Sequence, residues 1–175
     1  MSTPTYDRPA ADEYAEFHAG YVAGVPEGDL LQMLAAQGKE TTALIGAVPE
    51  SRGGFSYAPD KWTLKDVLGH MADAERVFSY RALRIARGDL IPLPGFDENA
   101  WVPEAGAGAR TLKDLAEELR LVRGSTLALF RHLPVEVVTR RGTASGTTVS
   151  VRALAWIIAG HERHHVRIIR DRYLA

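Results

Sequence analysis

Four segments of the chain carry apolar residues at helical spacing, and stretches rich in Gly, Ser and Pro separate them. Apolar residues that recur every three or four positions are typical of a helix with one buried face. Alternating patterns, which would indicate strands, are almost absent. The sequence therefore predicts an all-α fold, a four-helix bundle whose helices cover residues 27–48, 64–87, 112–132 and 151–173.

Polar residues mark where three of these helices begin. Thr63 and Asp66 form a capping-box-like pattern, Thr111 opens a second TLKD sequence, and Ser150 precedes the last helix. The connections are long for a small bundle. One of them, RGTASGTT at 141–148, indicates a turn or a short hairpin.

The length of 175 residues predicts one domain, 1–175, in which 26–175 form the bundle. Residues 1–25 contain Tyr14, Phe17 and Tyr21 at the spacing of one helical face, so we expect them to pack on the bundle as an N-terminal arm.

Composition excludes several classes of function. The chain has no cysteine, which rules out disulfides, thiolate metal ligands and a protein thiol nucleophile. A formal net charge of −1 gives no electrostatic footprint for nucleic acid. Neither a signal peptide nor an apolar run of the ~18 residues needed to cross a membrane is present, so we expect a soluble, cytoplasmic protein without nucleic-acid or membrane partners.

Histidines on the core-facing stripes point to a metal site. His161 and His165 lie one helical turn apart, in a stripe with Leu154, Ile158 and Ile168, so both rings face inward. Two buried imidazoles need polar partners, and a metal ion provides them. His70 lies on the inward face of its own predicted helix and is the candidate third ligand.

The other histidines fit this pattern less well. His132 stands at a helix end, where it can cap the last carbonyl groups. His18 belongs to the arm and has no evident partner, and His164 is one position off the stripe. Arg81 shares the face of His70 but lies eleven residues, ~16 Å, further along the helix. It is therefore too far away to bind the metal, but it can bind the far end of an anionic substrate.

Residues 161–165 also match the zinc-protease pattern HExxH, in which the Glu is the general base. Only ten residues follow His165, too few for the downstream ligand that many such proteases use, which disfavours this interpretation. Glu162 neighbours the ligands in sequence but points about 100° away from His161 along the helix. It is the candidate catalytic residue, as a base or as a support for the ligands.

Residues 61–89, 92–102 and 150–174 together resemble the DinB/YfiT-like superfamily, through sequences such as TLKDVLGHMADAE, PLPGFDENAWV and AGHERHHVRIIRD. By this likeness His70, His161 and His165 match the metal-binding triad of the family. The resemblance implies a four-helix bundle, often a homodimer. Several relatives are transferases that use bacillithiol, mycothiol or glutathione, and many others have no assigned reaction.

The expected cofactor is one divalent metal ion, such as zinc, nickel or iron, with one coordination position open. Three functions follow. The chain can be a metal-dependent transferase that activates a low-molecular-weight thiol toward an electrophile, the choice favoured by the resemblance. It can be a metal-dependent hydrolase that uses metal-bound hydroxide. It can also be a stress-related metal-binding protein without turnover.

The positions of the three histidines along the bundle axis predict the order in which the helices run up and down. If the second and fourth helices ran parallel, His70 would lie ~10 Å from one end of the bundle and His161 and His165 ~16 and ~22 Å from it. If they ran antiparallel, His165 and His161 would lie at ~12 and ~18 Å, closer to His70. We therefore expect an up-down-down-up order, which the resemblance also implies.

Overall fold

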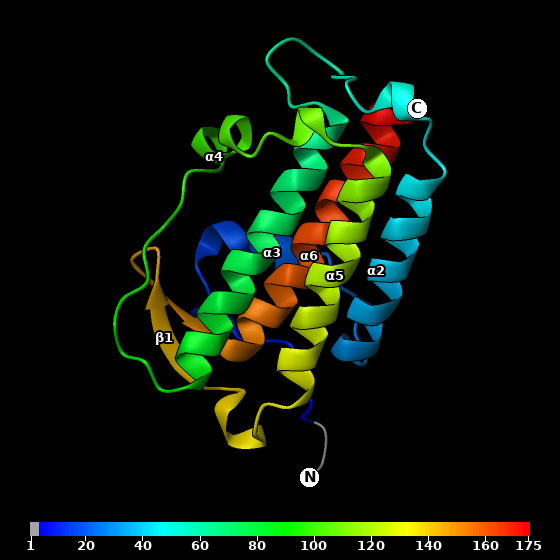
Figure 1. The fold of residues 1–175 in the computed structure, drawn as a ribbon. Helices are drawn as coiled ribbons and strands as arrows, with labels where there is room; N and C mark the ends of the chain where they lie inside the picture. The colour runs from blue at the N-terminus through cyan, green and yellow to red at the C-terminus, as the bar shows by residue number, and fades with distance from the viewer. Residues whose placement is uncertain (1–3) are drawn as a thin grey trace.

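The computed structural model describes residues 4–175, and four long helices packed side by side dominate it (Figure 1). This confirms the predicted helical bundle, with helix ends that differ from the predicted ones by a few residues. The four helices are α2 (Leu30–Gly46), α3 (Leu64–Ala86), α5 (Leu112–Arg131) and α6 (Val151–Ile168), and α6 continues as a π-helical turn, η6 (Ile169–Tyr173).

Shorter elements lie at the ends and along one side of the bundle. None of the helices formed by residues 4–175 combines the length and hydropathy needed to cross a bilayer. The short elements are η1 (Ala11–Glu13), η2 (Glu16–His18), α1 (Ala19–Ala23), η3 (Glu50–Arg52), α4 (Glu98–Glu104), η4 (Ala107–Ala109), η5 (Val135–Val137), β1 (Arg141–Ala144) and β2 (Thr147–Ser150).

The helix starts follow from local hydrogen bonds. Thr63 Oγ1 accepts from the backbone N–H of Asp66, whose carboxylate accepts from the N–H of Thr63 at 3.0 Å, which completes the predicted capping box. The hydroxyl oxygens of Thr111 and Ser150 accept from the backbone N–H groups of Asp114 and Ala153 at the starts of α5 and α6. Each cap satisfies N–H groups that have no partner inside the helix.

The predicted hairpin at 141–148 is present as the antiparallel pair β1 and β2. Ser145 and Gly146 form its tight turn with φ angles of 52° and 77°, the left-handed region that such two-residue turns require. Leu93 donates its N–H to the carbonyl of Thr143 at 2.9 Å, so the long connection after α3 is attached to the hairpin.

In Figure 1, α2 and α6 run upward, whereas α3 and α5 run downward. Hydrogen bonds hold the upper ends together: Leu112 N–H donates to Glu50 at 2.8 Å, and Tyr173 donates to the carbonyl of Trp62 at 2.7 Å. The start of α3 therefore lies beside the end of α6. This arrangement brings His70, near the start of α3, level with the C-terminal half of α6.

The core consists of two apolar clusters with polar residues between them. The lower cluster contains Trp156 and Phe130, and the upper one contains Leu64 and Tyr173, all of them buried. Eight of the ten charged and polar residues that are buried in the four long helices lie between these clusters, all except Arg81 and Thr126: Gln37, Thr41, His70, Glu75, Arg123, His161, Glu162 and His165. A polar layer inside a bundle is costly unless every group in it is satisfied.

The N-terminal arm consists of η1, η2 and α1 in succession. The expectation that Phe17 packs on the bundle was wrong, because its side chain is 68% exposed. Tyr14 and Tyr21 do pack against the core, and residues 1–3 of the predicted arm lie outside the described residues. The long connection 89–110 contains the short helix α4.

Gly160 permits α1 to lie directly on α6. A Cβ atom built on Gly160 would lie 2.1 Å from the backbone oxygen of Tyr21, which no rotamer change can relieve. We expect Gly160→Ala to lower the free energy of unfolding by ~1–3 kcal/mol, the range for overpacking. Gly124→Ala is the matched control, because open space surrounds Gly124 inside α5 and the change there should stabilise by about 0.5–1 kcal/mol. Urea unfolding of both variants checks the difference, and equal effects would contradict it.

Candidate metal centre

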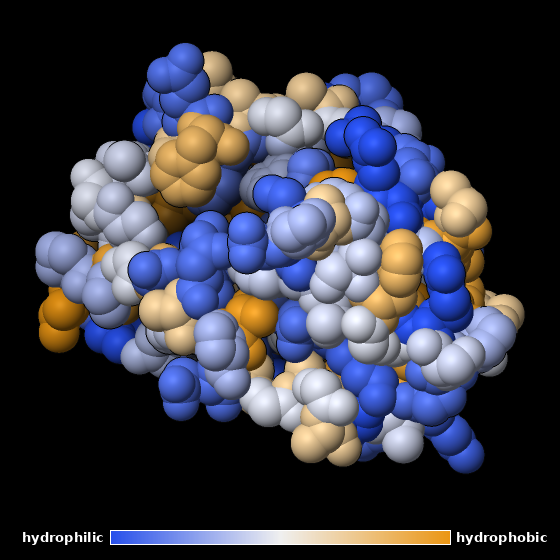
Figure 2. Space-filling view, turned by 90° about the horizontal axis from the view of Figure 1, so that it is seen from above, coloured by the Kyte–Doolittle hydropathy of each residue, from blue (hydrophilic) through white to orange (hydrophobic). Residues whose placement is uncertain are grey.

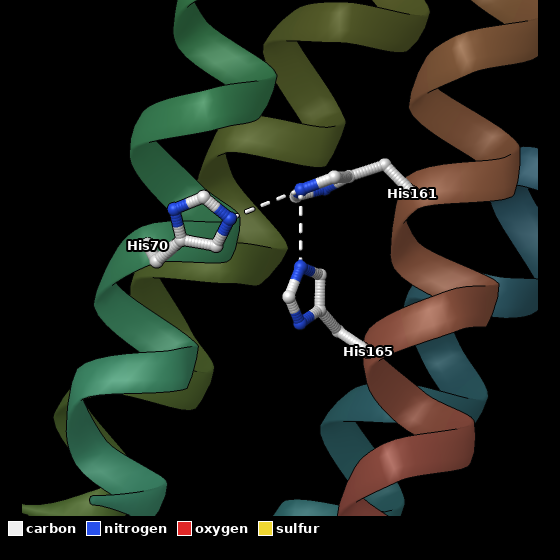
Figure 3. A group of neighbouring side chains, drawn as sticks. All are labelled: His70, His161 and His165. Atoms are coloured by element: carbon white, nitrogen blue, oxygen red, sulfur yellow. Dashed lines mark hydrogen bonds between the residues drawn. The ribbon is translucent and has the colours of Figure 1, made fainter. Parts of the chain in front are cut away.

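Three histidine side chains from two helices converge on one point. His70 projects from α3, and His161 and His165 project from α6 toward it (Figure 3). The Nε2 atom of His161 lies 3.1 Å from that of His70 and 3.2 Å from that of His165. All three side chains are buried, and among residues 4–175 they form a group whose ligand atoms lie within 4.8 Å of one another.

Hydrogen bonds alone cannot satisfy this arrangement. The Nε2 atom of His161 carries either one proton or one lone pair, so neutral rings cannot make both short contacts as hydrogen bonds. A cation that accepts a lone pair from each ring satisfies all three. A tetrahedral ion with metal–nitrogen bonds of ~2.0–2.1 Å separates its ligand atoms by about 3.3 Å, close to the spacing observed.

The surroundings keep the three rings in the neutral form that binds metal. Burial lowers the pKa of His165 to about 3, and the charges of His70 and His164 act in the same direction. The pKa of His161 is lowered far below its usual value, mainly by burial and then by the charges of His165 and His70. The pKa of His70 is lowered by burial as well, although Glu98 and Asp73 oppose that shift. No proton therefore competes strongly for these nitrogens at neutral pH.

Aromatic rings surround the centre, and the sequence did not connect Trp62 and Tyr21 with it. Trp62 lies 4.8 Å from the ring of His70, and Tyr21 and Phe78 lie 5.4 and 5.8 Å from the ring of His161, measured between centroids. Burial and then the charge of Glu98 raise the pKa of Tyr21. Phe78 belongs to α3, whereas Tyr21 and Trp62 come from the arm and a loop, whose packing no helical periodicity predicts. Figure 2 shows the upper end of the molecule as mostly hydrophilic, with scattered apolar side chains and a hollow among them.

Glu162, the candidate base, faces away from the three imidazoles. Its carboxylate accepts hydrogen bonds from Thr41 at 2.7 Å, from Gln37 at 3.0 Å and from Arg123 at 2.8 Å. Arg123 in turn donates two hydrogen bonds to Glu75, at 2.8 and 2.7 Å. The structure therefore places Glu162 in a buried ion cluster, unlike the HExxH arrangement, in which the Glu reaches the reacting atoms.

None of the remaining histidines belongs to the converging group, although the ring of His164 lies 5.1 Å from that of His165. His132 is exposed at the end of α5, as expected for a helix cap. His164 is half-buried, and its ring lies 5.3 Å from that of Tyr21. His18 is buried, and its Nδ1 atom has no hydrogen-bond partner among the described residues.

Comparison with known proteins places this arrangement in a family. No curated protein matches the chain significantly. A solved structure, YfiT from Bacillus subtilis, is similar with a TM-score of 0.67 and 18% identity, over 93% of this chain and 89% of that one. It is described as "a probable metal-dependent hydrolase with an unusual four-helix bundle topology", and at this identity the likeness shows the fold. The sequence profile of the DinB superfamily matches residues 33–169, most of the chain, and the protein therefore belongs to the DinB superfamily.

Proposed function

We propose that His70, His161 and His165 hold one divalent metal ion and that the protein is a metal-dependent enzyme. The observation that carries this proposal is the convergence of three neutral, buried Nε2 atoms without a fourth His, Asp or Glu in the group, among the residues described. A structural zinc site normally has four protein ligands, whereas a catalytic site keeps one position open. Imidazole ligands suit zinc, nickel and iron, and the donor set alone does not choose among them.

When bound at three neutral imidazoles, a divalent ion lowers the pKa of a bound water toward ~7 and deprotonates a bound thiol. The chain's own residues supply the rest. The three imidazoles fix the position of the reacting group, and the rings of Tyr21, Trp62 and Phe78 limit the access of water to it. The sequence contains no cysteine, so any thiol must come from a small-molecule substrate.

Two reactions fit such a site, and a separate observation favours each. Transfer of a small thiol to an electrophile is favoured because Glu162, the acid next to a ligand in sequence, is held by Arg123, Thr41 and Gln37. A thiol that the metal deprotonates needs no protein base. Hydrolysis is favoured by the similarity to YfiT, which is described as a probable metal-dependent hydrolase. We place thiol transfer first, and a homodimer in the cytoplasm stays a prediction.

Activity assays with and without metal test this proposal. We expect the zinc- or nickel-loaded protein to consume bacillithiol, mycothiol or glutathione in the presence of 1-chloro-2,4-dinitrobenzene. Removal of the metal should slow this reaction at least about 100-fold, since the ion supplies the thiolate. His132→Ala, which changes an exposed helix cap, is the control and should keep the full rate.

The same assays distinguish the alternatives. Metal-dependent hydrolysis of 4-nitrophenyl acetate in the absence of thiol, without any thiol consumption, would favour the hydrolase. A rate of thiol consumption that persists after metal removal would contradict metal-activated thiol transfer. Metal binding without either activity would favour a metal-binding protein that has no turnover.

A further inference from the structure

Arg81 is a buried cation without a counter-charge. Its side chain projects from α3 and is 4% exposed, yet no carboxylate lies within ion-pair distance among the described residues. Only its Nη2 atom makes hydrogen bonds there, to the carbonyl of Pro94 at 2.8 Å and to Ser145 Oγ at 3.0 Å. Arg123, the other buried arginine, pairs with two carboxylates. Because buried guanidinium groups are normally paired, Arg81 has unused capacity for an anion.

His18 lies near the same aromatic ring as Arg81, because the ring centroid of Phe78 is 6.0 Å both from the His18 centroid and from the guanidinium carbon. Its side chain is 8% exposed, and Nδ1 makes no hydrogen bond within residues 4–175. Burial, followed by the positive charge of Arg81, lowers the pKa of His18 to about 4. The ring is therefore neutral at pH 7, and it can donate one hydrogen bond to an anion without adding a charge of its own.

Phe78 connects this pair to the metal centre. Its ring centroid lies 6.0 Å from that of His18, 6.0 Å from the Arg81 guanidinium carbon and 5.8 Å from the ring of His161. The ring centroid of Phe96 lies 5.8 Å from the same guanidinium carbon. The path from the three histidines to Arg81 thus runs along an aromatic surface.

We infer that Arg81 and His18 form an anion-binding subsite for the substrate of the metal centre. The ligand is a carboxylate or phosphate group on a molecule with an apolar, aromatic or alkyl body. The guanidinium fork binds such a group through its free N–H groups, His18 donates a further hydrogen bond, and Phe78 contacts the apolar body. Pro94 and Phe96, in the connection between α3 and α4, contact the guanidinium group of Arg81 beside this subsite. That the bound anion is a substrate rests on the proposed function, whereas the binding of the anion at this subsite does not.

Binding of small anions to the full-length, metal-stripped protein tests this inference, because no metal can then capture the anion. The probes are benzoate, phenyl phosphate and neutral benzamide, followed by calorimetry and by amide NMR shifts. We expect one of the two anions to bind and to shift the amides of His18, Phe96 and Ser145. Benzamide should bind at least tenfold more weakly, and the stronger of the two anions identifies the group as carboxylate or phosphate.

Variants assign the binding to these residues. We expect Arg81→Gln to weaken the preferred anion at least tenfold and Arg81→Lys to weaken it less, because lysine keeps the charge and loses the fork. Arg76→Gln is the matched control, since Arg76 lies on the same helix with a side chain 48% exposed and pairs with Asp73 and Glu118. That change should leave the affinity unaltered.

Three results would overturn the inference. The first is that Arg81→Gln binds the anion as tightly as the unaltered protein does. The others are that benzamide binds as tightly as the anions, or that neither anion binds at millimolar concentration. If Arg81→Gln fails to fold, His18→Leu replaces it, and unchanged affinity in that variant counts against the subsite. Because the metal is absent throughout, failure here leaves the metal-dependent reaction standing, and failure of the reaction leaves the anion site standing.

Discussion

Replacing Arg123 with Met should lower the free energy of unfolding by about 3–5 kcal/mol, the range for a buried ion pair that loses one partner. Arg123 projects from α5 and contacts all three other bundle helices. It pairs with Glu75 of α3 and Glu162 of α6, and it donates to the carbonyl of Leu34 on α2 at 2.8 Å. Burial alone lowers the pKa of Arg123, but the hydrogen bonds and charges of Glu75 and Glu162 outweigh it and raise that pKa.

The size of the effect comes from what the substitution leaves behind. The side chains of Glu75 and Glu162 are only 8% and 9% exposed, so without Arg123 two carboxylates face each other away from water. Urea unfolding of Arg123→Met measures the loss. Arg120→Met is the control on the same helix, because Arg120 is 56% exposed and should change stability by less than ~0.5 kcal/mol.

A triple variant separates charge from packing. Glu75→Gln and Glu162→Gln, combined with Arg123→Met, remove the uncompensated charges and should recover part of the stability lost in the single variant. A loss below ~1 kcal/mol in Arg123→Met would mean that the cluster contributes little to the bundle. A triple variant less stable than the single one would show that the charges are not the cause.

Replacing any one of His70, His161 and His165 with Ala should weaken binding of zinc or nickel by more than about 100-fold. Loss of a residue that only hydrogen-bonds to a metal ligand lowers the metal affinity about 10–100-fold. Loss of one ligand in three removes a direct bond to the metal and should lower the affinity further. Two remaining imidazoles also leave a vacancy in the coordination that only solvent can fill. Metal titration against a competing chelator measures the affinities, and circular dichroism verifies that each variant folds.

His164→Ala is the matched control for this series. His164 directly precedes His165 but is half-buried beside Tyr21, outside the group of converging nitrogens. Its removal should change the affinity less than about threefold. Full metal affinity in His70→Ala would remove that residue from the centre, and a loss in His164→Ala as large as that in His165→Ala would mean that the described group is incomplete.

Helical periodicity and capping residues sufficed to predict the bundle. The apolar spacing around His161 and His165 predicted both the helix and the inward orientation of the two rings. Thr63 and Ser150 mark the starts of their helices through local hydrogen bonds. Such features depend on neighbours a few positions apart in the chain, which a sequence displays directly. His70 was found for the same reason, because its helix has a clear apolar face.

Contacts between segments that are far apart in the chain could not be predicted from the sequence. Arg123 was not singled out at all, because its partners Glu75 and Glu162 are 48 and 39 positions away. The direction of Glu162 was predicted, about 100° from His161, but not the buried cluster that it enters. Phe17 was misplaced because spacing along an arm of short helical turns does not describe a single helical face.

The central claim is that three imidazoles hold the metal, and X-ray absorption at the metal edge of the zinc-loaded protein tests it most directly. We predict three nitrogen ligands at ~2.0–2.1 Å with the outer-shell scattering of imidazole rings, together with one ligand that does not come from the protein, such as water. His165→Ala should show two such rings instead of three. A spectrum of the unaltered protein with two imidazoles or fewer, or with carboxylate oxygens in their place, would contradict the assignment of His70, His161 and His165.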